Sequence, residues 1–129
     1  MSSETLHEDP EKLGSDVIDA HRAIVSVMEE LEAVDWYNQR AKATTNPELR
    51  AILEHNRDEE KEHASMVLEW LRRNDPILAG HFKTYLFTEG SITGIETEAE
   101  HGGGSNASPA AGGSDTSLGI GSLRKVGGQ

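Results

Sequence analysis

The sequence contains no cysteine, which excludes disulfide bonds, thiolate metal sites, iron–sulfur clusters and cysteine nucleophiles. No apolar run approaches the roughly 20 residues that span a membrane, and residues 1–11 carry four acidic residues and no apolar segment of a secretory signal. Positive charge is scarce too, because 12 Lys and Arg face 23 Asp and Glu, a net charge of −11. This balance repels phosphate, so it argues against nucleic-acid and anionic-membrane partners and favours cations.

Glycine and charge are divided unevenly along the 129 residues, a length that allows one small domain. Nine of the 13 glycines follow residue 100, and residues 101–129 carry a net charge of +1, which leaves −12 for residues 1–100. A Gly/Ser/Ala-rich segment cannot bury a core. We therefore divide the chain into a disordered acidic leader, a folded helical domain, a flexible linker, a short segment with aliphatic residues and a tail: residues 1–14, 15–100, 101–116, 117–124 and 125–129.

Apolar residues recur at spacings of three and four in two long segments, which predicts two amphipathic helices. The first covers residues 15–43, and no proline or glycine interrupts it. The second covers residues 47–74, because Asn46 is a good N-cap and Pro47 fits the first helical position. It ends there because Pro76 disfavours helix at the residue before it.

Two shorter helical segments follow, over residues 76–87 and, with a glycine that weakens the prediction, over residues 91–100. Only about three residues, 44–46, join the two long helices, so these helices are expected to form an antiparallel hairpin. A single hairpin of this length cannot bury its apolar stripes, and the third helix is too short to cover them. The sequence therefore predicts an all-α fold in which the hairpin associates with a second copy of itself.

Two helices carry ionisable residues where an apolar residue is expected. Glu60 and His63 form a Glu-x-x-His pair, whose side chains project from one face of the second helix between apolar residues of the same column. Glu30 lies in a similar apolar stripe of the first helix. A carboxylate in such a position is unfavourable unless it is paired or bound to metal. The alternative is a solvated charged face, which is the commoner origin of a Glu-x-x-His spacing taken alone.

These three residues make half of a known kind of metal site. A carboxylate-bridged diiron site in a helical bundle takes one Glu from each of two helices and a Glu-x-x-His from each of two others. Two copies of this chain would supply four carboxylates and two imidazoles, and two Fe(II) ions would neutralise the four negative charges. These ligands suit iron or manganese, although zinc and cobalt could occupy them. Metal binding is then expected to promote assembly and to release protons.

Four segments resemble the encapsulated ferritins, a ferritin-like family packed inside bacterial encapsulin compartments. The resemblance covers nearly all of the predicted domain and runs through HRAIVSVMEELEAVDWY (21–37), HNRDEEKEHA (55–64), LEWLRRNDP (68–76) and TYLFTEG (84–90). It implies a two-helix subunit that dimerises into a ferritin-like four-helix bundle, with dimers assembling into an open ring, typically a decamer. It also implies a cytoplasmic ferroxidase in the encapsulin lumen that serves iron storage and detoxification.

The resemblance assigns roles to individual residues. The ferroxidase ligands fall on Glu30, Glu60 and His63. Further carboxylates, Glu29 and Glu32, resemble a site through which metal enters, where calcium or other divalent ions could also bind. Two aromatic residues complete the assignment. Trp36 would lie near the metal entry site, and Tyr37 would lie beside the diiron centre. Without the resemblance, a solvated acidic face and packing at a helix end would explain these four outer residues.

The segment Ser117-Leu118-Gly119-Ile120-Gly121-Ser122-Leu123-Arg124 places three aliphatic residues within six positions of a glycine-rich tail. It resembles the C-terminal signal by which cargo proteins dock on the inner wall of the encapsulin shell. Leu118, Ile120 and Leu123 would be its anchors. A flexible linker before it would let several tails of one ring engage the wall together.

Three alternatives remain open at this point. The same dimer could hold zinc or calcium as a structural scaffold without catalysis. The same diiron core could act as a peroxidase or an oxygenase. The least specific alternative is an acidic coiled-coil adaptor whose tail alone carries the function.

Overall fold

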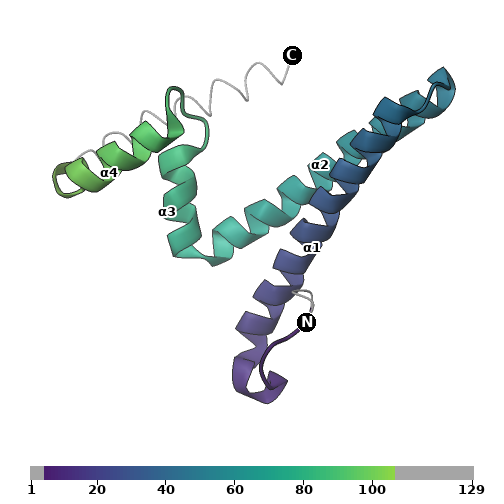
Figure 1. Cartoon of the computed structure of the whole chain (residues 1–129). Coiled ribbons are helices and arrows are strands. Elements are labelled where there is room, and N and C mark those ends of the chain that lie inside the picture. Colours follow the sequence, from purple (N-terminus) through teal and green to yellow (C-terminus); the bar gives the residue numbers. More distant parts are fainter. Residues whose placement is uncertain (1–4, 107–129) are drawn as a thin grey trace, which may run out of the picture. The chain divides into compact units, whose positions relative to one another are not determined.

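The computed structural model describes residues 5–106, and these residues form helices and no strand. Four helices follow one another along the chain (Figure 1): α1 (Pro10–Ala43), α2 (Pro47–Asn74), α3 (Pro76–Tyr85) and α4 (Ile92–Asn106). The chain divides into two units, Met1–Gly80 and His81–Gln129. None of the described helices combines the length and apolar character that crossing a membrane requires. The predicted all-α class is confirmed.

The start of α1 differs from the prediction. The Asp9 carboxylate accepts a hydrogen bond from the backbone N–H of Glu11, 3.1 Å away, and Pro10 occupies the first helical position. The helix therefore begins within the segment expected to be a disordered leader. Gly14 then interrupts it with a non-helical backbone (φ 83°, ψ 159°), a left-handed conformation that favours glycine. The continuous part of α1 follows this kink.

The second long helix has the predicted bounds, 47–74. The Asn46 side chain accepts a hydrogen bond from the backbone N–H of Leu49 at 2.9 Å, and Pro47 follows it. After α2, the Asp75 carboxylate accepts a hydrogen bond from the N–H of Leu78 at 3.0 Å and caps α3.

The two shorter helices end at other positions than expected. The third helix ends at Tyr85 rather than near residue 87, because Phe87 has a left-handed backbone (φ 63°) that no α-helix contains. The fourth helix runs from Ile92 to Asn106, so it extends past residue 100 into the segment 101–116 that was expected to be a linker. Its start is capped by Ser91, whose hydroxyl accepts a hydrogen bond from the N–H of Gly94 at 3.0 Å.

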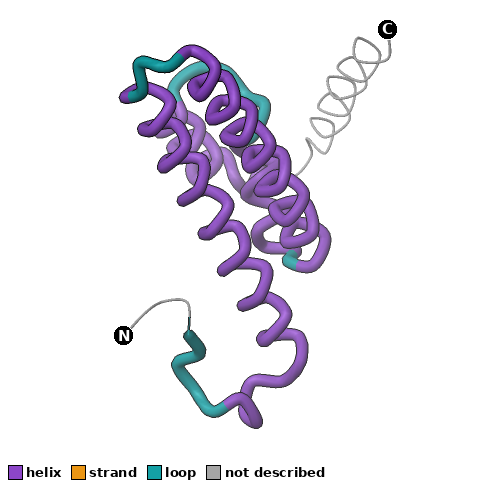
Figure 2. Tube along the Cα trace, turned by 90° about the vertical axis from the view of Figure 1, so that its right-hand side faces the viewer, coloured by secondary structure: helices purple, strands orange, loops and turns teal. Residues whose placement is uncertain are grey.

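Helices α1 and α2 lie side by side as an antiparallel hairpin, joined by residues 44–46 (Figures 1 and 2). Two arginines of α2 fasten them near this turn. Arg50 donates from Nε to the backbone carbonyl of Ala41 at 3.0 Å and from Nη2 to that of Thr44, where the last carbonyls of α1 lack helical partners. Arg57 donates from Nη1 to the Asn38 side-chain oxygen at 3.0 Å.

The hairpin buries very little. Within the described part, the buried apolar residues are Ala41, Ala64 and Leu71. In contrast, large apolar side chains of both helices are exposed, among them Ile24, Leu31, Ile52 and Met66, which is 59 % exposed. An apolar groove of about 480 Å³ also opens between the helices, lined in part by Ala23, Val67 and Trp70. This uncovered surface is what the sequence led us to expect of a hairpin that needs a partner.

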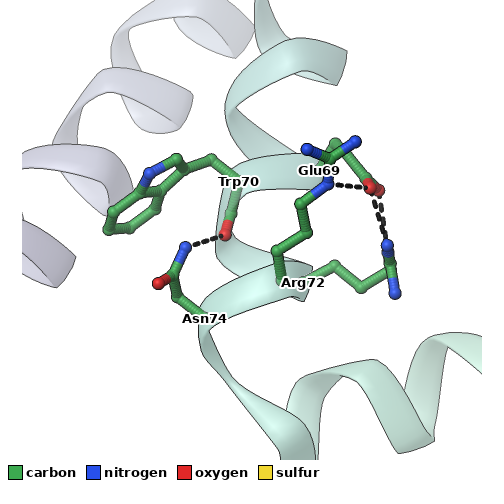
Figure 3. Close-up of polar contacts among 5 residues, drawn as sticks. Glu69, Trp70, Arg72 and Asn74 are labelled. Carbon is green, nitrogen blue, oxygen red and sulfur yellow. Dashed lines mark hydrogen bonds and ion pairs between the residues drawn. The ribbon is translucent and has the colours of Figure 1, made fainter.

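The last turns of α2 carry different chemistry on their two sides (Figure 3). On one side, the Glu69 carboxylate accepts hydrogen bonds from Arg72 at 2.8 and 2.7 Å and from Arg73 at 2.7 Å. On the other side, the Trp70 indole extends toward the pale purple turns of α1, and its backbone carbonyl accepts a hydrogen bond from Asn74 at 2.8 Å. We call Glu69, Arg72 and Arg73 the Glu69 ion cluster.

Candidate metal centre

The two helices bring Glu30 of α1 together with Glu60 and His63 of α2. The His63 Nδ1 atom lies 3.1 Å from Glu60 Oε1 and 3.7 Å from Glu30 Oε1. One potential ligand atom from each residue lies within 4.8 Å of the other two. We call these three residues the ligand group. It occupies the position in the hairpin at which the sequence predicted a half-site.

Local structure explains why these side chains meet. Glu60 and His63 are three residues apart in a continuous helix, so they share one face of α2. Ala64, the next residue, is buried, and its small side chain lets α1 approach closely. The side chains of Glu30 and Glu60 remain 28 % and 23 % exposed. A single hairpin therefore holds the group at its surface rather than inside a core.

Electrostatics make the ligand group a place that attracts positive charge. Glu60 raises the pKa of Glu30, because its carboxylate hydrogen-bonds the protonated form and repels the ionised one, and partial burial acts in the same direction. Hydrogen bonds from Glu30 and His63 lower the pKa of Glu60. The Glu60 carboxylate in turn raises the pKa of His63 by stabilising the imidazolium. Proton binding is therefore favoured at Glu30 and His63 and disfavoured at Glu60.

Within residues 5–106, no Lys or Arg forms an ion pair with Glu30 or Glu60. The His63 imidazole is therefore the described side chain that offers these carboxylates positive charge when it is protonated, and a divalent cation would compete with that proton. Two carboxylates and one imidazole are donors that iron and manganese accept. The residues present fit such a metal.

The outer residues of the sequence prediction lie elsewhere on α1. Glu29 and Glu32 are exposed and do not join the ligand group. Trp36 is about half-exposed, and Tyr37 is partly buried. Arg40 was not among the residues predicted from the sequence. Its guanidinium lies 6.0 Å from the centre of the Trp36 ring and 5.6 Å from the centre of the Tyr37 ring. Arg40 follows Trp36 by four residues and Tyr37 by three, a helical spacing from which these contacts could have been predicted.

The predicted docking residues Leu118, Ile120 and Leu123 lie outside the described residues. The same holds for residues 107–116 of the expected linker and for the tail, 125–129.

Comparisons with known proteins decide the family. Residues 5–89 match the EncFtn-like family. The chain belongs to this family. It is 63 % identical over 127 residues to the encapsulated ferritin-like protein of Rhodospirillum rubrum, an alignment that covers 96 % of this chain and 91 % of that protein. The resemblance to encapsulated ferritins stated from the sequence is thereby confirmed.

Two further proteins are similar to this chain. The encapsulin nanocompartment cargo protein EncC of Myxococcus xanthus is 34 % identical over 105 residues, which cover 78 % of this chain and 81 % of that protein. The crystal structure of protein ne0167 from Nitrosomonas europaea superposes with a TM-score of 0.66 at 56 % identity, over 67 % of this chain and 96 % of that one.

Proposed function

We propose that this EncFtn-like protein is a ferroxidase, which oxidises Fe(II) to Fe(III) at a site completed by a second copy of the chain. The observation that carries this proposal is the ligand group itself. Two carboxylates and an imidazole from two helices lie within 4.8 Å of one another, and no Lys or Arg of the described residues pairs with the carboxylates. Iron-related function follows from the family, and these donors are the ones iron accepts.

The second copy supplies the other half of the site. Two ligand groups across a two-fold axis would provide four carboxylates and two imidazoles, the set that a helical-bundle diiron centre uses. The partial exposure of Glu30 and Glu60 and the uncovered apolar surface of the hairpin both support this association. We further propose that such dimers assemble into an open ring, a decamer by analogy with the family resemblance.

In this arrangement Fe(II) is the substrate. Glu30 and Glu60 would bridge or chelate the two irons, and His63 would bind one iron in each half. The protons held by the ligand group would leave when iron binds. Two Fe(II) ions give up two electrons to the oxidant, dioxygen or hydrogen peroxide. The exposed carboxylates Glu29 and Glu32, with Trp36 beside them, would lie on the route of entering metal, and Tyr37 would lie near the irons.

An open ring cannot enclose mineral, so we propose that the protein works as cargo in the lumen of a cytoplasmic encapsulin compartment, which stores the iron. The Myxococcus xanthus relative EncC is named an encapsulin nanocompartment cargo protein. In this chain, residues 117–124 would dock on the shell through Leu118, Ile120 and Leu123, and the residues between α4 and this segment would serve as a tether.

Aerobic addition of Fe(II) tests the ferroxidase proposal. We expect the wild type to produce a rapid rise in near-ultraviolet absorbance from Fe(III), and Glu30→Ala to lose that rise beyond the background of free iron. Glu69→Ala is the matched control, because it removes a carboxylate of the same hairpin that two arginines already neutralise. Equal rates for wild type and Glu30→Ala would overturn the assignment.

Co-expression with an encapsulin shell protein tests the docking proposal. A chain ending at Asp115 is expected to stay outside the purified shells, and so is a full-length chain with Leu118, Ile120 and Leu123 all changed to alanine. Loading of either variant at the wild-type level would show that the tail is not the docking element.

A further inference from the structure

A polar groove lies near the turn of the hairpin, at the other end of α2 from the apolar groove. It measures about 340 Å³ and is lined by residues of both helices: Asn38, Ala41 and Lys42 of α1, and Arg50, Glu54 and Arg57 of α2. Three of these side chains are cationic and one is anionic. This local excess of positive charge stands out in a chain whose net charge is −11.

Two of the cations are held in place by bonds that leave part of each guanidinium available. Arg50 uses Nε and Nη2 for the carbonyls of Ala41 and Thr44. Arg57 uses Nη1 for the Asn38 side-chain oxygen and Nε for Asp58. Among the described residues, Arg50 Nη1 and Arg57 Nη2 have no hydrogen-bond acceptor. Guanidinium groups that are already oriented lose little side-chain freedom when they bind a ligand.

Two further donors line the same groove. The Asn38 oxygen accepts the bond from Arg57, so the amide nitrogen of Asn38 remains as a donor. The Lys42 ammonium makes no ion pair with any residue in the described part of the chain. Two carboxylates oppose these cations. Asp58 pairs with Arg57 at 2.9 Å and has the larger effect in raising the pKa of that guanidinium, and Glu54, which lines the groove, acts in the same direction.

We infer that this groove is an oxyanion-binding site of the inorganic phosphate class. A tetrahedral oxyanion matches its chemistry, because the lining residues include two guanidinium groups, an ammonium and an amide, all of which donate hydrogen bonds to oxygen. Three cations against Glu54 and the Asp58 carboxylate that pairs with Arg57 leave one net positive charge, which complements an anion. The site is independent of the proposed ferroxidase chemistry, since no residue of the ligand group lines the groove.

The variants that test this inference shift phosphate affinity in opposite directions. Lys42→Gln removes a cation that holds nothing else in place among the described residues, and we expect it to weaken phosphate binding by about threefold or more, as for one partly exposed ion pair. Glu54→Gln removes the opposing carboxylate that lines the groove and is expected to strengthen binding by a similar factor. Lys12→Gln, a matched charge change on α1 outside the groove, should bind phosphate as the wild type does.

The measurement is isothermal titration calorimetry of inorganic phosphate into the metal-free, full-length protein, with ionic strength held constant by sodium chloride. Metal-free protein ensures that phosphate cannot bind through bound iron. We expect one saturable site per chain and competition by sulfate. The inference is overturned if no saturable binding occurs at constant ionic strength, if Lys42→Gln and Lys12→Gln weaken binding equally, or if Glu54→Gln weakens it.

Discussion

The ligand group and the Glu69 ion cluster lie on the same hairpin and contain the same kind of carboxylate, yet their charges are arranged in opposite ways. Glu69 meets two guanidinium groups within 2.8 Å (Figure 3), and these hold its pKa at about 2. Glu30 meets another carboxylate, and its pKa is raised. One cluster carries two guanidinium counter-charges, whereas the other sets two carboxylates and one imidazole together with no Lys or Arg partner among the described residues.

This difference shows where the protein can accept a cation. The Glu69 ion cluster is built within one helix from neighbours three and four residues apart, so it needs nothing from outside. The ligand group is built across two helices and has no basic partner among the described residues. Acidic residues alone do not mark a metal site, but two carboxylates held close together without a Lys or Arg partner do favour one.

The largest expected effect is on metal affinity. Replacing Glu60 by alanine removes a proposed ligand and the hydrogen-bond partner of His63. We expect the affinity for Co(II) to fall at least about 100-fold, because losing a ligand costs more than losing a residue that only hydrogen-bonds to a ligand. Anaerobic calorimetry measures this affinity. Glu69→Ala should bind Co(II) like the wild type, and equal losses in both variants would erase the distinction between the clusters.

The next effect is on association. Metal bound between two copies should stabilise the dimer, because four clustered carboxylates repel without it. In sedimentation velocity, we expect the wild type to shift to larger species when Co(II) or Fe(II) is added anaerobically, and Glu30→Ala to remain unchanged. If the metal-free wild type already has its final mass and metal leaves that mass unaltered, assembly does not depend on the ligand group.

Lowering the pH should weaken metal binding at the ligand group. The pKa of His63 is raised above its ordinary 6.5 by Glu60, and the pKa of Glu30 is raised as well, so protons compete with metal as the pH falls through these values. The stability of the metal-free protein depends on pH in the opposite direction. The His63–Glu60 pair stabilises the fold below pH 6.5, the ordinary pKa of histidine, and this contribution disappears as the pH rises through the raised pKa of His63 in the folded state.

Two titrations together test this opposition. Calorimetry with Co(II) should show binding that tightens from pH 6 to pH 8 and that releases more protons at pH 6 than at pH 8. The melting temperature of the metal-free wild type relative to His63→Ala should be highest at pH 6. A metal affinity that is independent of pH would contradict the competition between protons and metal at the ligand group.

The smallest expected effect comes from Glu69→Gln. Exposed ion pairs contribute little to stability, so the melting temperature should fall only slightly. The pKa of Glu69 is lowered from 4.5 to about 2. Its contribution to folding stability is therefore complete above pH 4.5 and is lost as the pH falls toward 2. The melting-temperature difference between wild type and variant should therefore be equal at pH 7 and pH 5.5. A difference that grows between these values would mean that the cluster is coupled to the ligand group.

Much of the hairpin could be predicted from the sequence because its signals are local. Asn46 and Pro47 mark the start of α2, and the helical spacing of Glu60 and His63 places both on one face. The earlier start of α1 was missed, although Asp9 and Pro10 form the same kind of start signal. The pairing across helices, as between Arg57 and Asn38, depends on the register of α1 against α2, which spacing within one helix does not fix.

Anomalous diffraction at the iron edge tests the central claim most directly. A crystal of the full-length protein grown or soaked with iron should show two anomalous peaks related by a two-fold axis between copies, each within coordination distance of Glu30, Glu60 and His63. Peaks found only at other carboxylates, with the ligand group empty, would contradict the account.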